Sequence, residues 1–234
     1  MKRSKVIILI LVLLSLSYFY GFVTAQFKVF PYEIIKQTKN LFSEETVKRS
    51  NIYYQKKSFF EEFGQSQYDV VFIGDSITER ADWEDIFPTY KIANRGIHGD
   101  TSDGILDRLD SILSTNAESA FIMLGINDFS KGASVSSVFK NYEKLVNKLL
   151  LSSFKVYIQS TIFGGSRVSE LNTSINELNL KLKKLTLGND NLTYIDLNNT
   201  LSKNNLLMPK FTQDGVHLNS DGYKAWKESI KIYF

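Results

Sequence analysis

Residues 68–76 carry the sequence YDVVFIGDS, in which the apolar run at residues 70–73 leads directly into Gly74, Asp75 and Ser76. A short run rich in β-branched and aromatic residues, ending at a glycine, is typical of a buried strand. A serine placed immediately after such a strand has its hydroxyl at the end of the sheet. The stretch therefore predicts a buried strand followed by a loop that presents a candidate nucleophile, although Ser76 is also suited to capping the next helix.

Four further runs resemble the first one in composition. They are YKIAN at residues 90–94, SAFIML at 119–124, KVYIQST at 155–161 and LTYIDL at 192–197. Amphipathic stretches separate or follow them, at residues 101–113, 136–151, 169–185 and 220–234. Apolar strands that alternate with helices indicate parallel pairing, so we predict an α/β fold, a three-layer α/β/α sandwich with a five-stranded parallel sheet. In such sheets, ligands bind outside the carboxyl ends of the strands.

The overall charge excludes several classes of protein. The chain has 234 residues, 28 Lys+Arg and 25 Asp+Glu, so its formal net charge is +3. Lys2, Arg3 and Lys5 account for all of it, since 28 minus 3 leaves 25 cations against 25 anions. A neutral remainder offers no basic face for nucleic acid. The absence of cysteine excludes a disulfide scaffold, an iron–sulfur protein and a Cys-ligated zinc site.

The N-terminal residues 1–25 have the pattern of an export signal. Three cations precede about twenty residues without charge, at positions 6–25. The length of this run and the aromatic cluster at its end favour a retained signal anchor, a hydrophobic helix that holds the rest of the chain on the extracytoplasmic side of the membrane. The alternative is cleavage near Ala25, which would yield a secreted or periplasmic protein.

Two segments follow this N-terminal helix. Residues 26–63 are predicted to form a connector and an amphipathic helix, with Ser43 as its N-cap and an end at about Phe63. Residues 64–234 are predicted to form one domain that contains all five strands. No repeat and no second domain is evident.

Two more loops after predicted strands carry residues suited to ester chemistry. Gly96 follows the second strand, where a glycine permits close approach and its N–H is suited to bind an oxyanion. Asn127 follows the third strand, and its carboxamide is a suitable oxyanion donor. Each of these residues alone is equally compatible with an ordinary turn.

Asp214 and His217 stand near the C-terminus with two residues between them. This spacing lets the carboxylate bind one ring nitrogen and leave the other free as a base. The chain has only two histidines. His98 is interpreted as a loop or pocket residue, and Asp75 as an acceptor that organises the loop around Ser76.

Together these segments resemble the SGNH hydrolases, the GDSL-type esterase/lipase superfamily, over about residues 68–230. Four blocks occur in the family's order, namely Gly74-Asp75-Ser76, Gly96, Gly125-Ile126-Asn127-Asp128 and Asp214-Gly215-Val216-His217. The surrounding residues are most similar to the branch that contains platelet-activating-factor acetylhydrolase subunits and carbohydrate O-acetylesterases. The resemblance implies a flavodoxin-like SGNH fold.

The resemblance also implies a role for each matched residue. Ser76 is expected to attack the ester carbonyl, His217 to transfer its proton, and Asp214 to orient His217. The oxyanion is expected to lie between the N–H groups of Ser76 and Gly96 and the side chain of Asn127. No cofactor and no metal are expected.

Short predicted loops without a lid favour a small acyl group, above all acetyl, and export favours O-acetylated glycans as substrates. Asp75, Trp83 and His98 are weak candidates for the substrate pocket. Trp83, Phe87 and Phe163 are expected either to line an acceptor groove or to pack in the core. Alternatives are an O-acyltransferase on the same site, a lysophospholipase or lipase-type acylhydrolase, an anchored glycan-binding protein, and a metal hydrolase built on Asp75, Asp214 and His217.

Overall fold

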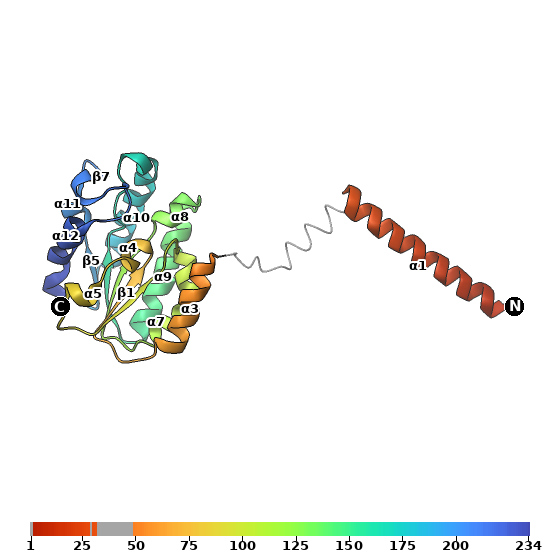
Figure 1. The fold of residues 1–234 in the computed structure, drawn as a ribbon, viewed down its shortest axis with the longest axis horizontal. Coiled ribbons are helices and arrows are strands. Elements are labelled where there is room, and N and C mark those ends of the chain that lie inside the picture. Colours follow the sequence, from red (N-terminus) through yellow and green to blue (C-terminus); the bar gives the residue numbers. More distant parts are fainter. Residues whose placement is uncertain (1, 29, 32–48) are drawn as a thin grey trace. The chain divides into compact units, whose positions relative to one another are not determined.

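The structure is a computed structural model that describes residues 2–28, 30–31 and 49–234. The contacts divide the chain into two units, Met1–Lys48 and Arg49–Phe234. The described part of the first unit is mainly one helix, α1 (Lys2–Phe27), drawn in red in Figure 1. Among the described residues, the structure has no helix that is long and apolar enough to cross a membrane. The signal anchor at residues 1–25 remains a prediction from the sequence.

The second unit is built around a parallel sheet with the strand order β2-β1-β3-β4-β5. The strands are β1 (Val70–Gly74), β2 (Ile92–Gly96), β3 (Ser119–Met123), β4 (Lys155–Gln159) and β5 (Leu192–Ile195). All four pairings are parallel, which confirms the predicted five-stranded sheet. The order reverses beside β1, since β2 lies on one side of it and β3 on the other. The loops after β1 and β3 therefore meet at the switch point where such sheets bind ligands.

Helices cover both faces of the sheet and complete the three layers. Figure 1 shows α11 and α12 on one side of it and α3, α7 and α9 on the other. The longer helices are α3 (Asn51–Phe63), α9 (Val135–Leu151), α10 (Asn172–Leu185) and α12 (Ser220–Ile230). The short ones are α4 (Ser76–Glu79), α5 (Trp83–Ile86), α6 (Ser102–Asp107), α7 (Leu109–Leu113), α8 (Ile126–Ser130) and α11 (Asn198–Leu201).

The helix predicted at residues 101–113 is in fact two helices, α6 and α7, which meet at Arg108. Arg108 leaves the helical conformation, with φ −114° and ψ 21°. Its side chain is fully buried, and its guanidinium pairs with Asp100 at 2.9 Å. A buried cation requires a partner of opposite charge, and Asp100 is that partner. The amphipathic pattern of residues 101–113 reveals neither this ion pair nor the break in the helix.

Helix α3 is the first helix of the unit Arg49–Phe234. Ser50 caps it by accepting a hydrogen bond from the N–H of Tyr53, and the helix ends at Phe63 as predicted. The predicted cap, Ser43, lies outside the described residues. The hydroxyl of Tyr53 donates to the carbonyl of Gly104 at 2.7 Å, which ties α3 to α6.

Aromatic side chains on adjacent strands form a ladder through the core. Phe72 on β1 is in register with Phe121 on β3, which is in register with Tyr157 on β4. Their ring centroids lie 5.1 Å and 4.5 Å apart. Trp83 stacks on Phe72 at 3.6 Å and is 2% exposed, so its ring packs in the core. The same residue borders a cavity of about 330 Å³, and its assignment to the substrate pocket stays a prediction.

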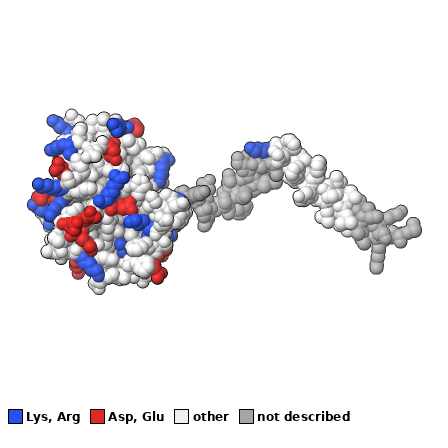
Figure 2. All heavy atoms as spheres, in the orientation of Figure 1, with Lys and Arg blue, Asp and Glu red and all other residues white. Residues whose placement is uncertain are grey.

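Charged side chains of both signs alternate over the face of the unit Arg49–Phe234 that Figure 2 shows. On this face no extended area is covered by Lys and Arg alone. This distribution agrees with the balanced charge of residues 6–234.

Candidate active site

Ser76 is the first residue of α4, and only Asp75 separates it from the end of β1. Asp75 is the N-cap, and its carboxylate accepts the N–H of Ile77 at 2.9 Å. A Cβ on Gly74 would lie 2.1 Å from Thr78 Oγ1 and 2.4 Å from the carbonyl oxygen of Met123. Glycine is therefore required where the chain turns from strand to helix, and this turn sets the position of the Ser76 side chain.

The loop before α12 brings His217 to Ser76. The Oγ of Ser76 lies 2.9 Å from Nε2 of His217, and Nδ1 of His217 lies 2.6 Å from Oδ2 of Asp214. The structure thus joins the three residues predicted as a triad in one chain of hydrogen bonds. This is the arrangement in which a base activates a serine hydroxyl and a carboxylate orients the base.

Asp214 is held in place by its own loop. Its Oδ1 accepts the backbone N–H groups of Val216 and His217 at 2.9 Å and 2.8 Å. Partial desolvation favours the neutral acid, but the hydrogen bonds from the ring and the backbone of His217 and from Val216 outweigh it. They hold the pKa of Asp214 well below its ordinary value, so the carboxylate is ionised at neutral pH.

Asn127 lies on α8, directly after β3. Gly125 makes the turn into this helix with a φ of +130°, a conformation that favours glycine. One N–H of the Asn127 amide donates to the carbonyl of Asp100 at 3.0 Å. Because a carboxamide nitrogen has two N–H groups, the second remains available to a ligand.

Gly96 does not offer the free N–H that was predicted for it. This N–H already donates to Oδ1 of Asn94 at 2.9 Å. A Cβ on Gly96 would lie 2.3 Å from the backbone nitrogen of Glu79, so the glycine permits β2 to pack against α4. The prediction of Gly96 as an oxyanion donor is therefore corrected: its role in the structure is close packing.

Gly99, in the same loop after β2, has open space on the side where a side chain would be. It has a φ of +71° in a turn closed by the N–H of Asp100 on the carbonyl of Ile97 at 3.1 Å. No atom lies within 4 Å of the position that a Cβ would take. Among the described residues, no acceptor binds its N–H or the N–H of Ser76. The two N–H groups are thus available at the loops after β2 and β1.

Asp75 is buried beneath the site and does not line a pocket. It is fully buried, and its Oδ2 has no hydrogen-bond partner among the described residues. Burial, with the nearby carboxylates of Asp100 and Asp128, raises the pKa of Asp75 to about 7, against the lowering effect of the Ile77 N–H. Its contact with the turn that carries Ser76 is the hydrogen bond from the N–H of Ile77, and the role of Asp75 as a loop-organising acceptor stays a prediction.

His98 is exposed and lies beside the triad. Its ring centroid is 6.5 Å from that of His217, with the ring planes 15° apart. The interpretation of His98 as a loop residue at the pocket matches this position. Phe87 and Phe163 are 6% exposed and belong to the core cluster, and Phe163 also lines a cavity of about 340 Å³.

Two residues near the site were not singled out in the sequence. Asn94 donates to the carbonyls of Thr78, Glu79 and Ala81 at 3.1–3.2 Å, so it ties β2 to the end of α4. Arg80 lies four residues after Ser76, and this spacing on a helical turn is the signal that could have identified it.

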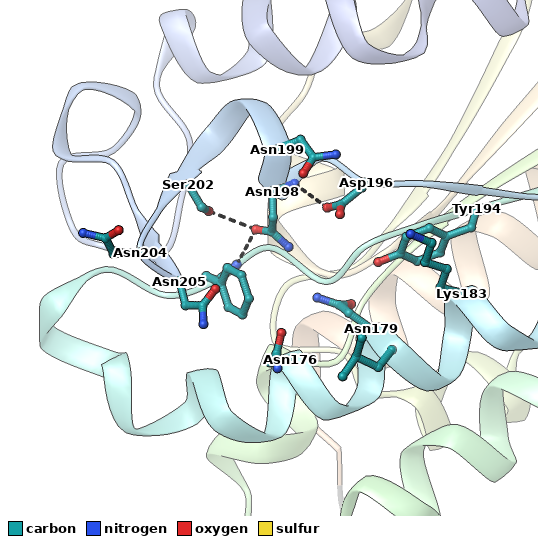
Figure 3. A pocket seen from close by; sticks show the side chains of 12 residues that line it. Asn176, Asn179, Lys183, Tyr194, Asp196, Asn198, Asn199, Ser202, Asn204 and Asn205 are labelled. Carbon is teal, nitrogen blue, oxygen red and sulfur yellow. Dashed lines mark hydrogen bonds between the residues drawn. The ribbon is translucent and has the colours of Figure 1, made fainter.

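Two cavities are relevant to ligand binding. One has a volume of about 240 Å³ and is lined by Arg80, Gln213, Asp214, His217, Leu218 and Asn219. The other has a volume of about 340 Å³ and lies between α10 and the segment after β5. Figure 3 shows asparagine side chains around this second cavity, which we call the amide pocket; they include Asn176, Asn199, Asn204 and Asn205. Among the described side chains, no group of three or more His, Asp or Glu is arranged to hold a metal ion.

The parallel sandwich, with its serine at the switch point of the sheet, has the fold of an SGNH hydrolase. The chain belongs to the GDSL-like lipase/acylhydrolase family, whose model matches residues 72–225. The resemblance seen in the sequence is thereby confirmed. Membership of an acylhydrolase family supports ester hydrolysis as the activity.

Solved structures share this fold. A protein provisionally described as a platelet activating factor from Streptococcus pneumonia is 23% identical, with a TM-score of 0.70 over 86% of this chain and 98% of that one. A lipase/acylhydrolase from Enterococcus faecalis is 25% identical, with a TM-score of 0.59 over 70% and 93%. An acetylxylan esterase from Geobacillus stearothermophilus, solved as a catalytic mutant, is 16% identical, with a TM-score of 0.58 over 71% and 92%.

Curated relatives include an N-acylneuraminate cytidylyltransferase from Streptococcus agalactiae. It is 26% identical over 186 residues, which cover 80% of this chain. The match spans 43% of the relative's length. The activity in the relative's name therefore belongs to a protein of which this chain resembles less than half.

Proposed function

We propose that the protein is a serine esterase that hydrolyses small acyl esters, above all acetyl esters. The observation that carries this proposal is the continuous hydrogen bonding from Ser76 through His217 to Asp214, at 2.9 Å and 2.6 Å. A serine hydroxyl is a weak nucleophile on its own, and it reacts with an ester when a base within hydrogen-bond reach takes its proton. Ser76 comes from the start of α4 at the carboxyl edge of the sheet, and Asp214 and His217 come from the segment before α12.

The reaction follows from this geometry in two steps. Ser76 Oγ attacks the ester carbonyl while Nε2 of His217 takes its proton, and Asp214 stabilises the resulting imidazolium. The tetrahedral intermediate collapses, His217 returns the proton to the departing alcohol, and the acyl group stays on Ser76. Water then attacks the acyl-enzyme by the same route, which releases the acid and restores the serine.

The oxyanion is proposed to bind the N–H groups of Ser76 and Gly99 and the free amide N–H of Asn127. Gly99 replaces Gly96 in this set because the Gly96 N–H is occupied by Asn94. The carbonyl of Asp100, the residue after Gly99, orients the Asn127 amide, which links these two loops at 3.0 Å. Preorganised donors of this kind stabilise the charge that develops in the transition state.

O-acetylated glycans are the proposed natural substrates. The amide pocket supports this choice, because it offers amide groups, the phenol of Tyr194 and one charge of each sign, from Lys183 and Asp196. Such a lining suits the hydroxyl groups of a sugar better than an acyl chain. The esterase among the similar structures acts on acetylxylan, which is consistent with the proposal.

An extracytoplasmic location is proposed on the sequence alone, from the three cations and the uncharged run at residues 6–25. Expression of the full chain with a C-terminal tag, followed by fractionation, tests it. Recovery from the cell envelope or the medium supports export, and recovery from the cytoplasm alone contradicts it.

The experiment for the proposed function compares aryl esters of acetate, butyrate, octanoate and palmitate as substrates of the full chain. We expect kcat/KM to be highest for acetate and to fall with chain length. A preference for palmitate would favour the lipase-type alternative. Transfer of acetyl to an added oligosaccharide, seen by mass spectrometry in place of free acetate, would favour the acyltransferase.

A further inference from the structure

Arg80 places a cation on the same helical face as the nucleophile. Its backbone N–H donates to the carbonyl of Ser76 at 3.1 Å, which closes the single turn of α4. Residues four apart on a helical turn lie side by side, with Cβ atoms about 5–6 Å apart. The turn that fixes Ser76 therefore also fixes the base of the Arg80 side chain.

The same cation lines the cavity beside the catalytic base. Arg80 borders the 240 Å³ cavity together with His217, Asp214 and Gln213. The Arg80 side chain is exposed. A group that enters this cavity is thus close both to His217 and to a guanidinium.

No described carboxylate forms an ion pair with Arg80, although the ionised Asp214 lines the same cavity. Glu79 pairs with Lys56 at 3.3 Å. Both oxygens of Asp214 accept hydrogen bonds from its own loop and from the His217 ring. Among the described residues, no carboxylate lies within ion-pair distance of Arg80.

We infer that Arg80 is a specificity residue that binds a carboxylate of the substrate, so that the preferred esters are acidic ones. This inference rests on the proposed function and adds the charge of the substrate to it. The planar guanidinium presents parallel N–H donors that match the two oxygens of a carboxylate. Gln213, also on the cavity wall, adds an amide beside them.

The position of Arg80 sets the shape of the substrate it selects. The carboxylate must lie a few bonds from the ester, since the cation is one helical turn from the nucleophile. Sugar acids and short hydroxy or aromatic acids that carry an acetyl group satisfy this requirement. The contact binds a part of the substrate that does not react and holds the ester carbonyl at Ser76.

The test uses the full chain and two aryl acetates of the same shape, 4-acetoxybenzoate and 4-acetoxybenzamide. The measured quantity is the ratio of their kcat/KM values, anionic over neutral, corrected for their rates with hydroxide. We expect Arg80→Met to lower this ratio about tenfold and Arg80→Lys to lower it less. Arg167→Met, at another exposed arginine, is expected to leave the ratio unchanged.

Salt supplies a second readout that a purely structural role would not move. We expect 0.5 M sodium chloride, roughly five times the ionic strength at which the screening length is about 10 Å, to lower the wild-type ratio and not that of Arg80→Met. Equal ratios in wild type and Arg80→Met would overturn the inference while leaving the proposed esterase in place. Absence of turnover of both esters would overturn the proposed function, and the inference with it.

Discussion

Ser76 and His217 are 141 positions apart in the chain, yet Ser76 Oγ and His217 Nε2 lie 2.9 Å apart. The contact joins the turn after β1 to the loop before α12. Local hydrogen bonds fix both partners of this contact. Asp75 caps α4, which begins with Ser76, and Asp214 accepts two backbone N–H groups in the loop of His217. Both carboxylates lead to predictions.

The first prediction concerns Asp214. Asp214→Asn should lower kcat on an aryl acetate by about 10³–10⁴, because an amide neither stabilises the imidazolium nor fixes the required ring tautomer. Because the pKa of Asp214 is low, this carboxylate stays ionised as the pH falls from 8 to 5. In the wild type it therefore continues to orient His217 over that whole range. Asp221→Asn, on the exposed first turn of α12, serves as the control. Comparable turnover in the two variants would contradict the role of Asp214.

The second prediction concerns Asn127. Asn127→Ala should lower kcat by about 10²–10³ and leave KM for an aryl acetate nearly unchanged, because the donor acts mainly on the transition state. Asn147→Ala, at an exposed position on α9, is the matched control. Steady-state kinetics of both variants give kcat and KM separately. A change confined to KM in Asn127→Ala would argue against an oxyanion role.

The third prediction separates the two glycines of the loop after β2. Gly96→Ala should lower the free energy of unfolding by about 3 kcal/mol, because its Cβ would collide with the backbone of α4 at Glu79. Gly99→Ala should cost only about 1–2 kcal/mol, from the positive φ alone, because its Cβ meets open space. Urea unfolding measures both, and a larger loss at Gly99 than at Gly96 would be the wrong order.

The same two variants, Gly96→Ala and Gly99→Ala, also distinguish the two glycines by their effect on kcat. Strain at Gly99 moves a proposed oxyanion donor, so Gly99→Ala should lower kcat more than its small loss of stability suggests. Gly96→Ala, assayed where it remains folded, should change kcat less. The reverse order would restore Gly96 as the donor.

The fourth prediction concerns the buried Asp75. The pKa of its carboxyl is about 7 in the folded protein and 3.8 ordinarily, chiefly because burial disfavours the charge. Between these values the unfolded chain releases the proton and the folded one keeps it, so the stability falls as the pH rises from 4 to 7, by up to about 4 kcal/mol. Asp75→Asn keeps the cap acceptor and removes the titration.

We therefore expect Asp75→Asn to gain stability relative to wild type as the pH rises, measured by urea unfolding at pH 4.5 and pH 8. Asp110→Asn, at an exposed site in the first turn of α7, should show no such trend. A difference between Asp75→Asn and wild type that is constant with pH would show that Asp75 is not protonated in the fold.

Local sequence patterns predicted the parts of the structure that depend on neighbours in the chain. The apolar runs became the five strands, and the Asp-x-x-His spacing placed Asp214 on the ring of His217 because three residues suffice for that contact. The rule that loops gather at the carboxyl edge of a parallel sheet predicted that Ser76 and Asn127 follow neighbouring strands, and the structure places them after β1 and β3.

Contacts between distant residues account for what the sequence could not predict. Gly96 and Gly99 are three positions apart in the sequence, and only the structure shows that the N–H of Gly96 is occupied, because it donates to Oδ1 of Asn94. Trp83 is next to acidic residues in the sequence, but its ring stacks on Phe72, eleven positions earlier. The break at Arg108 follows from a buried ion pair that the amphipathic pattern conceals.

Covalent trapping of the nucleophile tests the central claim most directly. A fluorophosphonate reacts with the oxygen of a serine that a neighbouring base activates, and fluoride leaves. After incubation of the full chain with this probe and proteolysis, mass spectrometry should find one adduct, on Ser76, with loss of esterase activity in proportion to labelling. The adduct should be absent from His217→Ala. An adduct on another residue, or complete inactivation without modification of Ser76, would contradict the account.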